Sequence, residues 1–360
     1  MTYTVGIVGC GDISDAYLSS DGRFGNYRIV ACSSLDRAQA EEKAAKHGID
    51  ALGVDELLAD PGVDIVVNLT PPDVHADVTL RALDAGNHVY TEKPIAASVA
   101  ASERILETAA ERDLLVGSAP DTFLGAALQT CRSVLDEGRI GEPIGATALW
   151  TSSGHESWHP NPDLFYREGG GPLLDVGPYY LTALVSLLGP ASRVTGSVTR
   201  AREERPITSE PRRGETIPVD VPTHETGIVD FENGVVGNVT ASFDVQGSSL
   251  PSPGFEIYGT EGTLSVPDPN HFDGTVSVHE RGEGWEDVPP THDYTDGRGI
   301  GVADLASALD SDWDHRTTGR LAHHVLEILT GVRRASTEGE HVSIDSTVER
   351  PSPLPRTFPY

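Results

Sequence analysis

The amino-acid sequence predicts an α/β protein of two domains: a doubly wound parallel sheet, followed by an α+β domain with an open, mostly antiparallel sheet. A length of 360 residues exceeds that of a usual single domain. Short apolar runs alternate with segments of helical periodicity through the first third of the chain. Alternating apolar and polar runs joined by glycine turns dominate a later part. We therefore expect one domain over residues 1–122 and a second over residues 123–360.

The first domain is predicted to alternate parallel strands with crossover helices. Apolar or β-branched runs predict strands within residues 3–8, 27–34, 63–70, 88–92 and 114–120. Periodic segments predict helices over residues 15–20, 36–48, 73–86 and 99–113. Ligands of such sheets bind beyond the carboxyl ends of the strands, so we expect a site at that edge.

The second domain is predicted to mix helices with antiparallel strands. Its expected elements are a helix over 126–138, a strand over 144–150, a helix over 169–189 that follows a glycine run, strands within 225–243, 254–266 and 274–281, and a last helix over 319–336. Asn233-Gly234 and Glu261-Gly262 mark turns between strands. We interpret the polar stretch 201–222 as a surface excursion.

Charge excludes two classes of partner. Acidic residues outnumber basic ones by 55 to 26, for a formal net charge of −29. Such a surface repels phosphates and anionic lipid headgroups, so we expect neither nucleic acid nor a membrane as a partner. No apolar run approaches the roughly 18 residues of a membrane-spanning helix. The acid excess and the scarcity of lysine favour a halophilic source.

The cysteines and the N-terminal residues indicate a compartment. Cys10, Cys32 and Cys131 are odd in number and widely spaced. This pattern favours buried thiols in a reducing cytoplasm over a disulfide framework or a zinc site. Residues 1–10 run into a strand without a basic segment or a cleavage site, so we expect no signal peptide and a cytoplasmic protein.

A glycine motif follows the first predicted strand and precedes a helix, as a dinucleotide-binding fingerprint requires. Gly9 allows a tight turn and Gly11 lets a pyrophosphate approach the backbone, while Ser14 stands at the third glycine position. Asp12 and Ile13 complete the loop as cofactor contacts. The plain alternative is an ordinary glycine turn.

The end of the second strand bears on the choice between NAD and NADP. An acidic residue is expected there when the ribose 2′-hydroxyl is bound. This chain has Ser33 and Ser34, with Asp36 and Arg37 just beyond. Hydroxyls beside an arginine suit a 2′-phosphate, so NADP is slightly favoured over NAD. The alternative is that Asp36 only caps the next helix and that Arg37 is solvated.

Lys93 is one of three lysines in the chain and lies between Glu92 and a proline, at the end of an apolar strand. Thr70, Pro71 and His75 follow the preceding strand. Both segments come to the carboxyl edge of the predicted sheet, where a nicotinamide has to lie. We therefore expect all five residues to contact the cofactor, although a lysine beside a glutamate is usually a surface ion pair.

These motifs resemble the glucose–fructose oxidoreductase/inositol dehydrogenase/MocA family. Residues 6–13, 63–94, 168–180 and 255–264 carry the resemblance in the expected order, so that it covers essentially the whole chain. The resemblance implies a Rossmann domain that binds NAD(P), a second α/β domain whose sheet face forms dimer or tetramer contacts, and a lysine that contacts both nicotinamide ribose and substrate. That lysine corresponds to Lys93.

The resemblance also implies a catalytic aspartate and, four residues on, a histidine that acts as acid and base. Asp175 fits the first position, but the second holds Tyr179. Some family members carry tyrosine there. A phenol titrates near pH 10, so Tyr179 as the base needs adjacent positive charge from Lys93 or the nicotinamide cation. Lys93, Asp175 and Tyr179 are then expected to converge in an interdomain cleft. The alternative is that Tyr179 only packs.

The loop over residues 154–171 is the expected substrate loop. His155, His159 and Asp163 recur at four-residue steps, but Pro160 and Pro162 preclude a regular helix that would align them for a metal, so no metal site is expected. The predicted substrate contacts are His155, Trp158, His159, Asn161 and Arg167. Trp158 would offer an apolar face to a sugar ring. Loop residues that bond only to one another are the alternative.

Three functions remain open on the sequence. The first is an NAD(P)-dependent dehydrogenase that acts on a ring hydroxyl of a sugar, cyclitol or glycoside. The second is an NAD-dependent glycoside hydrolase on the same fold, and the third is a cofactor-sensing regulatory protein without catalysis. The joint presence of Lys93, Asp175 and Tyr179 favours an enzyme. The exposed face of the second sheet predicts a homodimer or a homotetramer.

Overall fold

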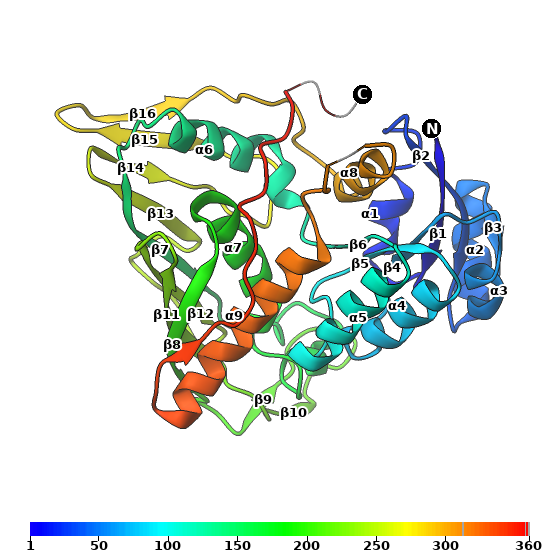
Figure 1. Ribbon diagram of the computed structural model, residues 1–360. Helices are drawn as coiled ribbons and strands as arrows, with labels where there is room; N and C mark the ends of the chain where they lie inside the picture. Colours follow the sequence, from blue (N-terminus) through cyan, green and yellow to red (C-terminus); the bar gives the residue numbers. More distant parts are fainter. Residues whose placement is uncertain (312, 357, 359–360) are drawn as a thin grey trace. The chain divides into compact units, whose positions relative to one another are not determined.

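The computed structural model describes residues 1–311, 313–356 and 358, and the chain divides into two compact units (Figure 1). The first unit contains Met1–Leu124, Thr295–His323 and Ser352–Tyr360, and the second contains Gly125–Tyr294 and His324–Pro351. The expected single boundary after residue 122 does not describe this division, because two later segments return to the first unit. Each unit is described by itself.

The first unit is built on a six-stranded sheet in the order β3-β2-β1-β4-β5-β6, in which every pairing is parallel. Its strands are β1 (Tyr3–Val8), β2 (Tyr27–Ser33), β3 (Asp50–Ala51), β4 (Ile65–Asn68), β5 (His88–Thr91) and β6 (Val116–Ser118). Its helices up to residue 124 are α1 (Ser14–Leu18), α2 (Arg37–His47), α3 (Val54–Leu58), α4 (His75–Asp84) and α5 (Val99–Glu111), with short 3₁₀ turns at η1 (Pro72–Val74) and η2 (Thr122–Leu124). The predicted doubly wound parallel sheet is confirmed.

Helix α8 (Ile300–Ala308) belongs to the first unit and was not predicted. It is buried on nearly every side and has no polar face, so its sequence lacks the periodicity by which helices are recognised. The helix packs on β5 and β6. The fully buried Asp121 carboxylate holds its start, since it accepts hydrogen bonds from the N–H groups of Gly299 and Gly301 and from Arg298. These bonds explain why the segment returns to the first unit.

The second unit is built on a nine-stranded sheet in the order β16-β15-β14-β13-β7-β12-β11-β8-β17, in which only β7 and β12 pair in parallel. Its strands are β7 (Pro143–Thr151), β8 (Ala191–Thr199), β11 (His224–Phe231), β12 (Val236–Ser242), β13 (Gly254–Gly259), β14 (Gly262–Ser265), β15 (Val276–Glu280), β16 (Trp285–Val288) and β17 (Val342–Ser343). Its helices are α6 (Ala126–Asp136), α7 (Pro172–Leu188) and the larger part of α9 (Gly319–Glu338), with the 3₁₀ turn η3 (Pro162–Phe165). The predicted open, mostly antiparallel sheet is confirmed.

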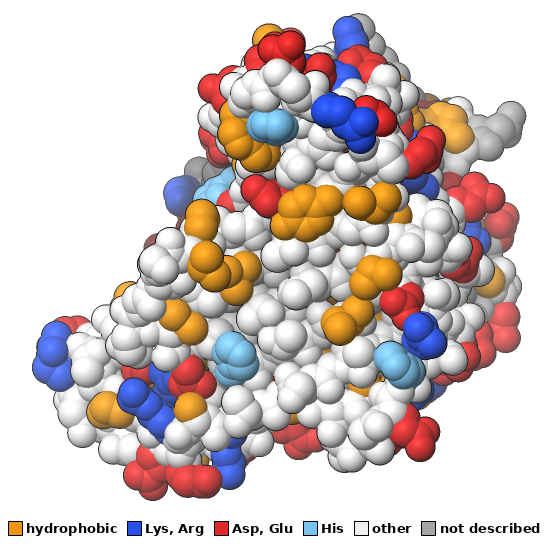
Figure 2. All heavy atoms as spheres, turned by 90° about the vertical axis from the view of Figure 1, so that its left-hand side faces the viewer, with side chains coloured by type: hydrophobic (Ala, Val, Ile, Leu, Met, Phe, Trp, Pro, Cys, Tyr) orange, Lys and Arg blue, Asp and Glu red, His pale blue; other side chains and the backbone are white. Residues whose placement is uncertain are grey.

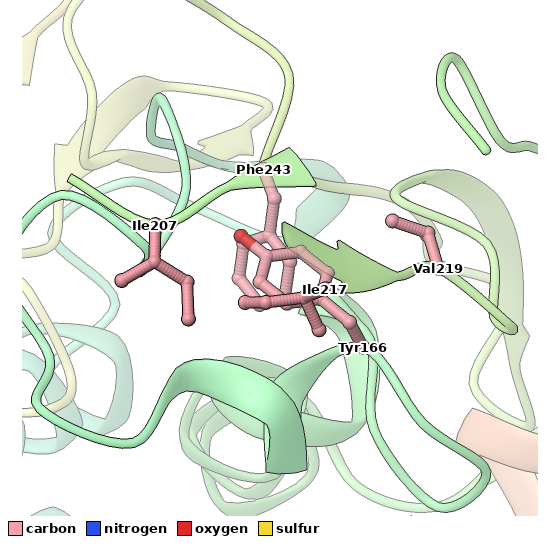
Figure 3. Close-up of a cluster of buried hydrophobic side chains, with 5 residues drawn as sticks. All are labelled: Tyr166, Ile207, Ile217, Val219 and Phe243. Carbon is pink, nitrogen blue, oxygen red and sulfur yellow. The ribbon is translucent and has the colours of Figure 1, made fainter. Parts of the chain in front are cut away.

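The polar stretch 201–222 is more than a surface excursion. Strands β9 (Glu204–Pro206) and β10 (Thr216–Pro218) form a separate hairpin in it. Buried side chains around this hairpin form one hydrophobic cluster (Figure 3), which consists of Tyr166, Ile207, Ile217, Val219 and Phe243. The sequence interpretation failed because the stretch has few large apolar residues, and Ile207, Ile217, Val219 and Val221 are all buried.

Two further observations concern the whole described chain. All three cysteines, Cys10, Cys32 and Cys131, are free and buried, as expected. Within residues 1–311, 313–356 and 358, no helix combines the length and the apolar character that a bilayer crossing requires.

Candidate functional site

The carboxyl edge of the first sheet collects the loops that follow β1, β2, β4 and β5. Gly9 lies after β1 with φ +107°, and a Cβ there would stand 2.6 Å from the carbonyl oxygen of Leu69. Only glycine therefore lets this loop pass beside the end of β4. A Cβ on Gly11 would meet nothing within 4 Å, which leaves the space beside that backbone open. Asp12 is exposed and Ile13 is half-buried in the same loop.

A buried network fixes the loop after β4. Asn68 is fully buried, and its amide group donates to the carbonyl of His75 at 3.0 Å and to the Thr79 hydroxyl at 3.1 Å. Its amide oxygen accepts from the N–H and the hydroxyl of Thr70. Thr70 thus has its hydroxyl engaged at the site edge, and the exposed Pro71 follows it.

His75 links the loop after β4 to the turn after β5. The ring is fully buried, with Nδ1 2.6 Å from the carbonyl of Pro94 and Nε2 2.6 Å from that of Thr70. Both partners are acceptors, so only an imidazolium would donate to both. Burial, however, lowers the pKa of His75 below its ordinary value, and we infer a neutral ring near pH 7. The expected direct cofactor contact does not fit this enclosed ring, which instead joins two loops of the site.

The turn after β5 carries Lys93, which lies between Glu92 and Pro94 in an E-K-P motif. Glu92 accepts the backbone N–H of Lys93 at 2.9 Å and the hydroxyl of Tyr17 at 3.0 Å. Its own N–H donates to the carbonyl of Asn68 at 2.8 Å. Glu92 therefore connects the turn to β4 and α1. These bonds also fix the backbone of the half-buried Lys93 at the end of the sheet.

The end of β2 differs in detail from the expectation. Ser33 is fully buried, and its hydroxyl lies 3.4 Å from the carbonyl of Ile7, so its side chain faces the sheet. The Ser34 hydroxyl donates to Gln39 at 3.0 Å. Asp36 caps α2 through the N–H groups at its start, and Arg37 forms an exposed pair with Glu41. Of the four residues, Ser34 and Arg37 remain compatible with a 2′-phosphate.

This edge fits a nicotinamide dinucleotide. The backbone beside Gly11 is open, Gly9 brings the first loop against the end of β4, and Lys93 supplies a cationic side chain on the neighbouring strand. Residues from the loops after β1 and β2 would hold the pyrophosphate and the adenosine ribose, and residues after β4 and β5 would hold the nicotinamide ribose.

In the second unit, a buried ion pair sets the start of α7. Glu225 of β11 is fully buried and pairs with Arg333 of α9 at 2.6 Å, while its other oxygen accepts the N–H of Leu173. A Cβ on Gly171 would stand 2.3 Å from Arg333, and one on Gly170 would stand 2.6 Å from the Phe165 carbonyl. The glycine run before α7 is thus needed for the backbone to pass this ion pair.

Asp175 and Tyr179 lie one turn apart on α7, as the sequence predicts, and both are half-buried. Burial and a neighbouring carboxylate raise the pKa of Tyr180 and of Tyr166 well above the ordinary value, so neither phenol can act as a base near neutral pH. The Tyr180 hydroxyl lies 3.3 Å from Asp268, and the ring packs against Phe255 of β13. Tyr179 is the tyrosine of this segment whose hydroxyl remains a candidate base.

His155 lies against Asp175. Its Nε2 is 3.3 Å from Oδ2 of Asp175, and its ring is buried among aromatic side chains. The ring stacks on Phe165 at 3.9 Å between centroids and meets Phe243 edge-on at 4.6 Å. Trp158 lies at 5.1 Å. The predicted substrate residue thus contacts a predicted catalytic residue.

The other loop residues lie closer to solvent. Trp158 is 63% exposed, which leaves an indole face available to a ligand. His159 is half-buried, and its Nδ1 accepts the N–H of Asn161 at 3.1 Å. Asn161 also accepts from Arg212 at 3.1 Å, and Arg167 is exposed.

The described residues contain no group of three or more His, Cys, Asp or Glu side chains placed to hold a metal ion. Asp163 pairs with Arg212, while His155 faces Asp175. The four-residue spacing of His155, His159 and Asp163 therefore does not bring these side chains to one point.

A buried ionic cluster behind the loop escaped the sequence analysis. Arg205 is 1% exposed, pairs with Glu156 at 2.6 Å and also pairs with Asp244. Tyr166 donates its hydroxyl to Glu156 and accepts the N–H of His155 at 3.0 Å. The cluster therefore holds the backbone at His155. No local pattern identifies it, because Arg205 and Asp244 lie far along the chain from the loop that contains Glu156 and Tyr166.

Comparison with known proteins gives matches to both parts of the chain. Residues 3–119 match a family described as an oxidoreductase family with an NAD-binding Rossmann fold. Residues 128–265 match the GFO/IDH/MocA C-terminal domain.

Individual relatives agree with these matches. The chain is 27% identical to the 1,5-anhydro-D-fructose reductase of Ensifer adhaerens, over 95% of this chain and 98% of that protein. It is 34% identical to the dTDP-3,4-didehydro-2,6-dideoxy-alpha-D-glucose 3-reductase of Streptomyces violaceoruber, over 54% of this chain and 57% of that protein. A levoglucosan dehydrogenase solved with NADH and L-sorbose has the same fold, with a TM-score of 0.82 at 20% identity over 96% of this chain and 99% of that one.

Proposed function

Because the chain belongs to the GFO/IDH/MocA oxidoreductase family, we propose that it transfers a hydride between a ring CH–OH group of a sugar, cyclitol or glycoside and a nicotinamide cofactor. The names of the two relatives support a carbohydrate substrate, since one is a 1,5-anhydro-D-fructose reductase and the other is a dTDP-3,4-didehydro-2,6-dideoxy-alpha-D-glucose 3-reductase. The observation that carries the proposal is the position of Lys93 after β5, on the sheet edge that also holds Gly9, Gly11 and Thr70.

In this proposal the chain's residues handle the substrate hydroxyl, while a bound nicotinamide supplies the hydride acceptor. Tyr179 accepts the hydroxyl proton as the C–H bond breaks, and the carbon is thereby oxidised to a ketone. Asp175, one turn earlier on α7, binds a neighbouring hydroxyl of the ring. Lys93 orients the reacting oxygen and stabilises negative charge on it. The exposed indole of Trp158 offers its face to the ring.

Reduction of NAD⁺ and NADP⁺ across a panel of monosaccharides, inositols and glycosides tests the proposal. We expect at least one polyol to drive net nicotinamide reduction. In Tyr179→Phe the packing should survive, because only one oxygen is lost, while turnover falls and its rise with pH on the alkaline side disappears. A Tyr179→Phe variant with the parental rate and pH profile would move the role of base to Lys93 or His159.

The same measurements separate the alternatives. An NAD-dependent glycoside hydrolase would release free sugar from a glycoside without net nicotinamide reduction, because its hydride returns in each turnover. A regulatory protein would bind the dinucleotide and turn over no member of the panel.

For the cofactor, we propose a slight preference for NADP. Ser34 is half-buried at the end of β2, and Arg37 begins α2 with its side chain 55% exposed. Asp36, the residue that would bind a 2′-hydroxyl, caps the start of α2 through its Oδ1. A higher kcat/KM for NAD than for NADP would refute this preference.

We also propose that the second sheet mediates a homodimer or homotetramer. Helix α7 packs against β7, β11 and β12, and the strands turn residues such as Ile144, Ile228 and Val236 outward, each exposed by 45% or more. The centre of the face in Figure 2 is largely uncharged, with acidic and basic side chains mostly toward its edges. This is unusual for a chain of net charge −29. A monomer mass by light scattering in high salt would contradict the proposal.

The remaining proposals concern the environment. The acidic composition supports a protein of a halophilic cytoplasm, where small residues and carboxylates keep the surface hydrated. We expect the purified protein to be more stable in molar salt than in dilute buffer. A purified protein that unfolds in molar salt but stays folded in dilute buffer would refute a halophilic source.

A further inference from the structure

Tyr17 of α1 donates a hydrogen bond to the motif that carries Lys93. Its hydroxyl lies 3.0 Å from Oε1 of Glu92, and the residue is 1% exposed. Burial, and after it the charge of Glu92, raises the pKa of the Tyr17 phenol well above the ordinary value, so the hydroxyl keeps its proton and remains a donor. Hydrogen bonds to a carboxylate are stronger than those between neutral groups. Tyr17 therefore holds the Glu92 carboxylate from a helix outside the turn.

The two carboxylate oxygens of Glu92 serve two different partners. Oε1 accepts from Tyr17, whereas Oε2 accepts the backbone N–H of Lys93 at 2.9 Å. Glu92 is half-buried, so a carboxylate without the Tyr17 bond would be free to turn toward water. The bond from Tyr17 thus keeps the carboxylate over the peptide from which the Lys93 side chain starts.

The other neighbour of Lys93 is held as well. The carbonyl of Pro94 lies 2.6 Å from Nδ1 of His75, at the start of α4. The backbone of Lys93 therefore lies between one residue that is fixed from α1 and one that is fixed from α4. An orienting ammonium needs such a fixed origin, since a misplacement of about 1 Å at a reacting group costs about 100-fold in rate.

Helix α1 also follows the loop that would receive the pyrophosphate. The helix starts at Ser14, whose N–H and hydroxyl both donate to the carbonyl of Gly11, at 3.0 Å and 2.6 Å. Tyr17 lies three residues further along the same helix. The glycine loop, Tyr17 and the turn after β5 are therefore parts of one connected structure.

We propose that Tyr17 is a positioning residue for Lys93: its hydroxyl holds the Glu92 carboxylate, which fixes the Lys93 backbone and with it the origin of the ammonium side chain. The activity that this serves is the proposed dehydrogenase reaction, on which the kinetic test rests. Tyr17 touches neither substrate nor cofactor in this role. Its loss should therefore lower turnover and leave the binding of the cofactor unchanged.

A matched pair of buried tyrosines tests the hydroxyl. Tyr90 is fully buried with its ring centroid 6.4 Å from that of Tyr17, and its hydroxyl has no hydrogen-bond partner among the described residues. Tyr17→Phe and Tyr90→Phe each remove one buried oxygen, but only the first removes a bond to Glu92. We expect Tyr17→Phe to lower kcat about 10- to 100-fold, as for outer partners that orient the ligands of metal sites, with the Kd of the cofactor unchanged. Tyr90→Phe should retain the parental kcat.

The scarcity of lysine supplies a readout that needs no substrate. Reductive methylation with ¹³C-formaldehyde labels the N-terminal amine and the three lysines of the chain, Lys43, Lys46 and Lys93. The ¹³C NMR signal of Lys93 is identified by its loss in Lys93→Ala. We expect this signal to shift in Tyr17→Phe and to keep its parental position in Tyr90→Phe.

A parental kcat in Tyr17→Phe would overturn the proposal, and so would equal losses of kcat in the two tyrosine variants, which would show a packing effect. Should no sugar be turned over, the dehydrogenase proposal fails by itself, and an unmoved Lys93 signal in Tyr17→Phe still overturns the positioning role. Hydrogen exchange of the parental protein needs no variant. The backbone N–H of Lys93 should be protected by Glu92, and rapid exchange there would overturn the inference even if Tyr17→Phe folds poorly.

Discussion

The site residues of the two units are held in different ways. In the first unit, neighbouring parallel strands end side by side, and short loops present Gly9, Thr70 and Lys93 from the backbone edge. In the second unit, the loop over residues 154–171 is held by side chains from distant segments, above all by Arg205, which pairs with Glu156 of the loop and with Asp244. We therefore expect a change at the edge of the first sheet to affect chemistry alone, whereas a change in the side chains that hold the loop over residues 154–171 should affect folding.

Replacing Lys93 gives the largest expected effect and tests the first half of the comparison. Lys93→Ala should lower kcat by about 10²–10⁴, the range for a lost acid–base or orienting group, while folding and cofactor affinity stay nearly intact. Steady-state kinetics and cofactor titration measure both. Lys46→Ala removes an exposed lysine that pairs with Asp15 and should leave kcat unchanged. An unchanged kcat in Lys93→Ala would mean that the E-K-P lysine is an ordinary surface residue.

Replacing Arg205 tests the expectation that a change behind the loop over residues 154–171 affects folding. Arg205→Met leaves the carboxylates of Glu156 and Asp244, 11% and 15% exposed, without their buried cation. Breaking a buried pair in this way costs about 3–5 kcal/mol of the free energy of unfolding. Denaturant unfolding at high salt measures the loss. Arg212→Met, in the loop of the same hairpin, removes a more exposed pair with Asp163 and should cost much less. Equal losses of unfolding free energy in Arg205→Met and Arg212→Met would show that the buried cluster does not hold the second unit in the way we expect.

His315 sharpens the comparison, because the first unit also contains a buried titratable group away from its site. Burial lowers the pKa of His315 to about 4, with Nε2 3.1 Å from the carbonyl of Val116 and Asp314, Arg320 and His88 as the charged or titratable neighbours. In the unfolded chain the ring takes a proton near pH 6.5. The unfolded state is therefore stabilised as pH falls from 6.5 to 4, and the protein loses stability in that window.

Between pH 7 and pH 5 this one group should account for about 2 kcal/mol of the lost free energy of unfolding. His315→Gln should flatten the pH dependence by that amount, whatever its own effect on stability at pH 7. His75 and His88, whose pKa values are also lowered by burial, keep part of the slope. A slope identical to that of the parent would show that His315 is protonated equally in both states.

The smallest effect is expected at Arg37, which follows β2 at the carboxyl edge of the first sheet. Arg37→Gln removes an exposed i,i+4 pair with Glu41, so the free energy of unfolding should stay within about 0.5 kcal/mol of the parent. The kcat/KM for NADP should fall while that for NAD stays constant, because a 2′-phosphate loses its cation. Equal changes in kcat/KM for NADP and NAD would show that Arg37 does not contribute to the choice of cofactor.

Four features could be predicted from short stretches of the chain: the alternating first unit, the glycine loop, the position of Lys93 after an apolar strand, and the helix that carries Asp175 and Tyr179. These features are local. A strand, a glycine turn and a helix are each specified by residues that are adjacent in the chain. The ends of parallel strands then meet at one edge of the sheet, independently of the rest of the chain. The free cysteines and the mostly antiparallel second sheet followed from similarly short patterns.

The burial of polar residues and the identity of their partners depend on contacts between distant segments, so they could not be predicted from the sequence. Arg205 lies in a stretch that looks solvated, and its burial depends on partners 49 and 39 residues away. Ser33 faces the sheet, His75 is enclosed between two carbonyls, and α8 lacks a periodic face. Likewise, the spacing of His155 suggested a metal or a substrate contact, but the fold sets it against Asp175. A charge or an imidazole is tolerated inside only where distant groups satisfy it, and such pairings leave no local pattern in the chain.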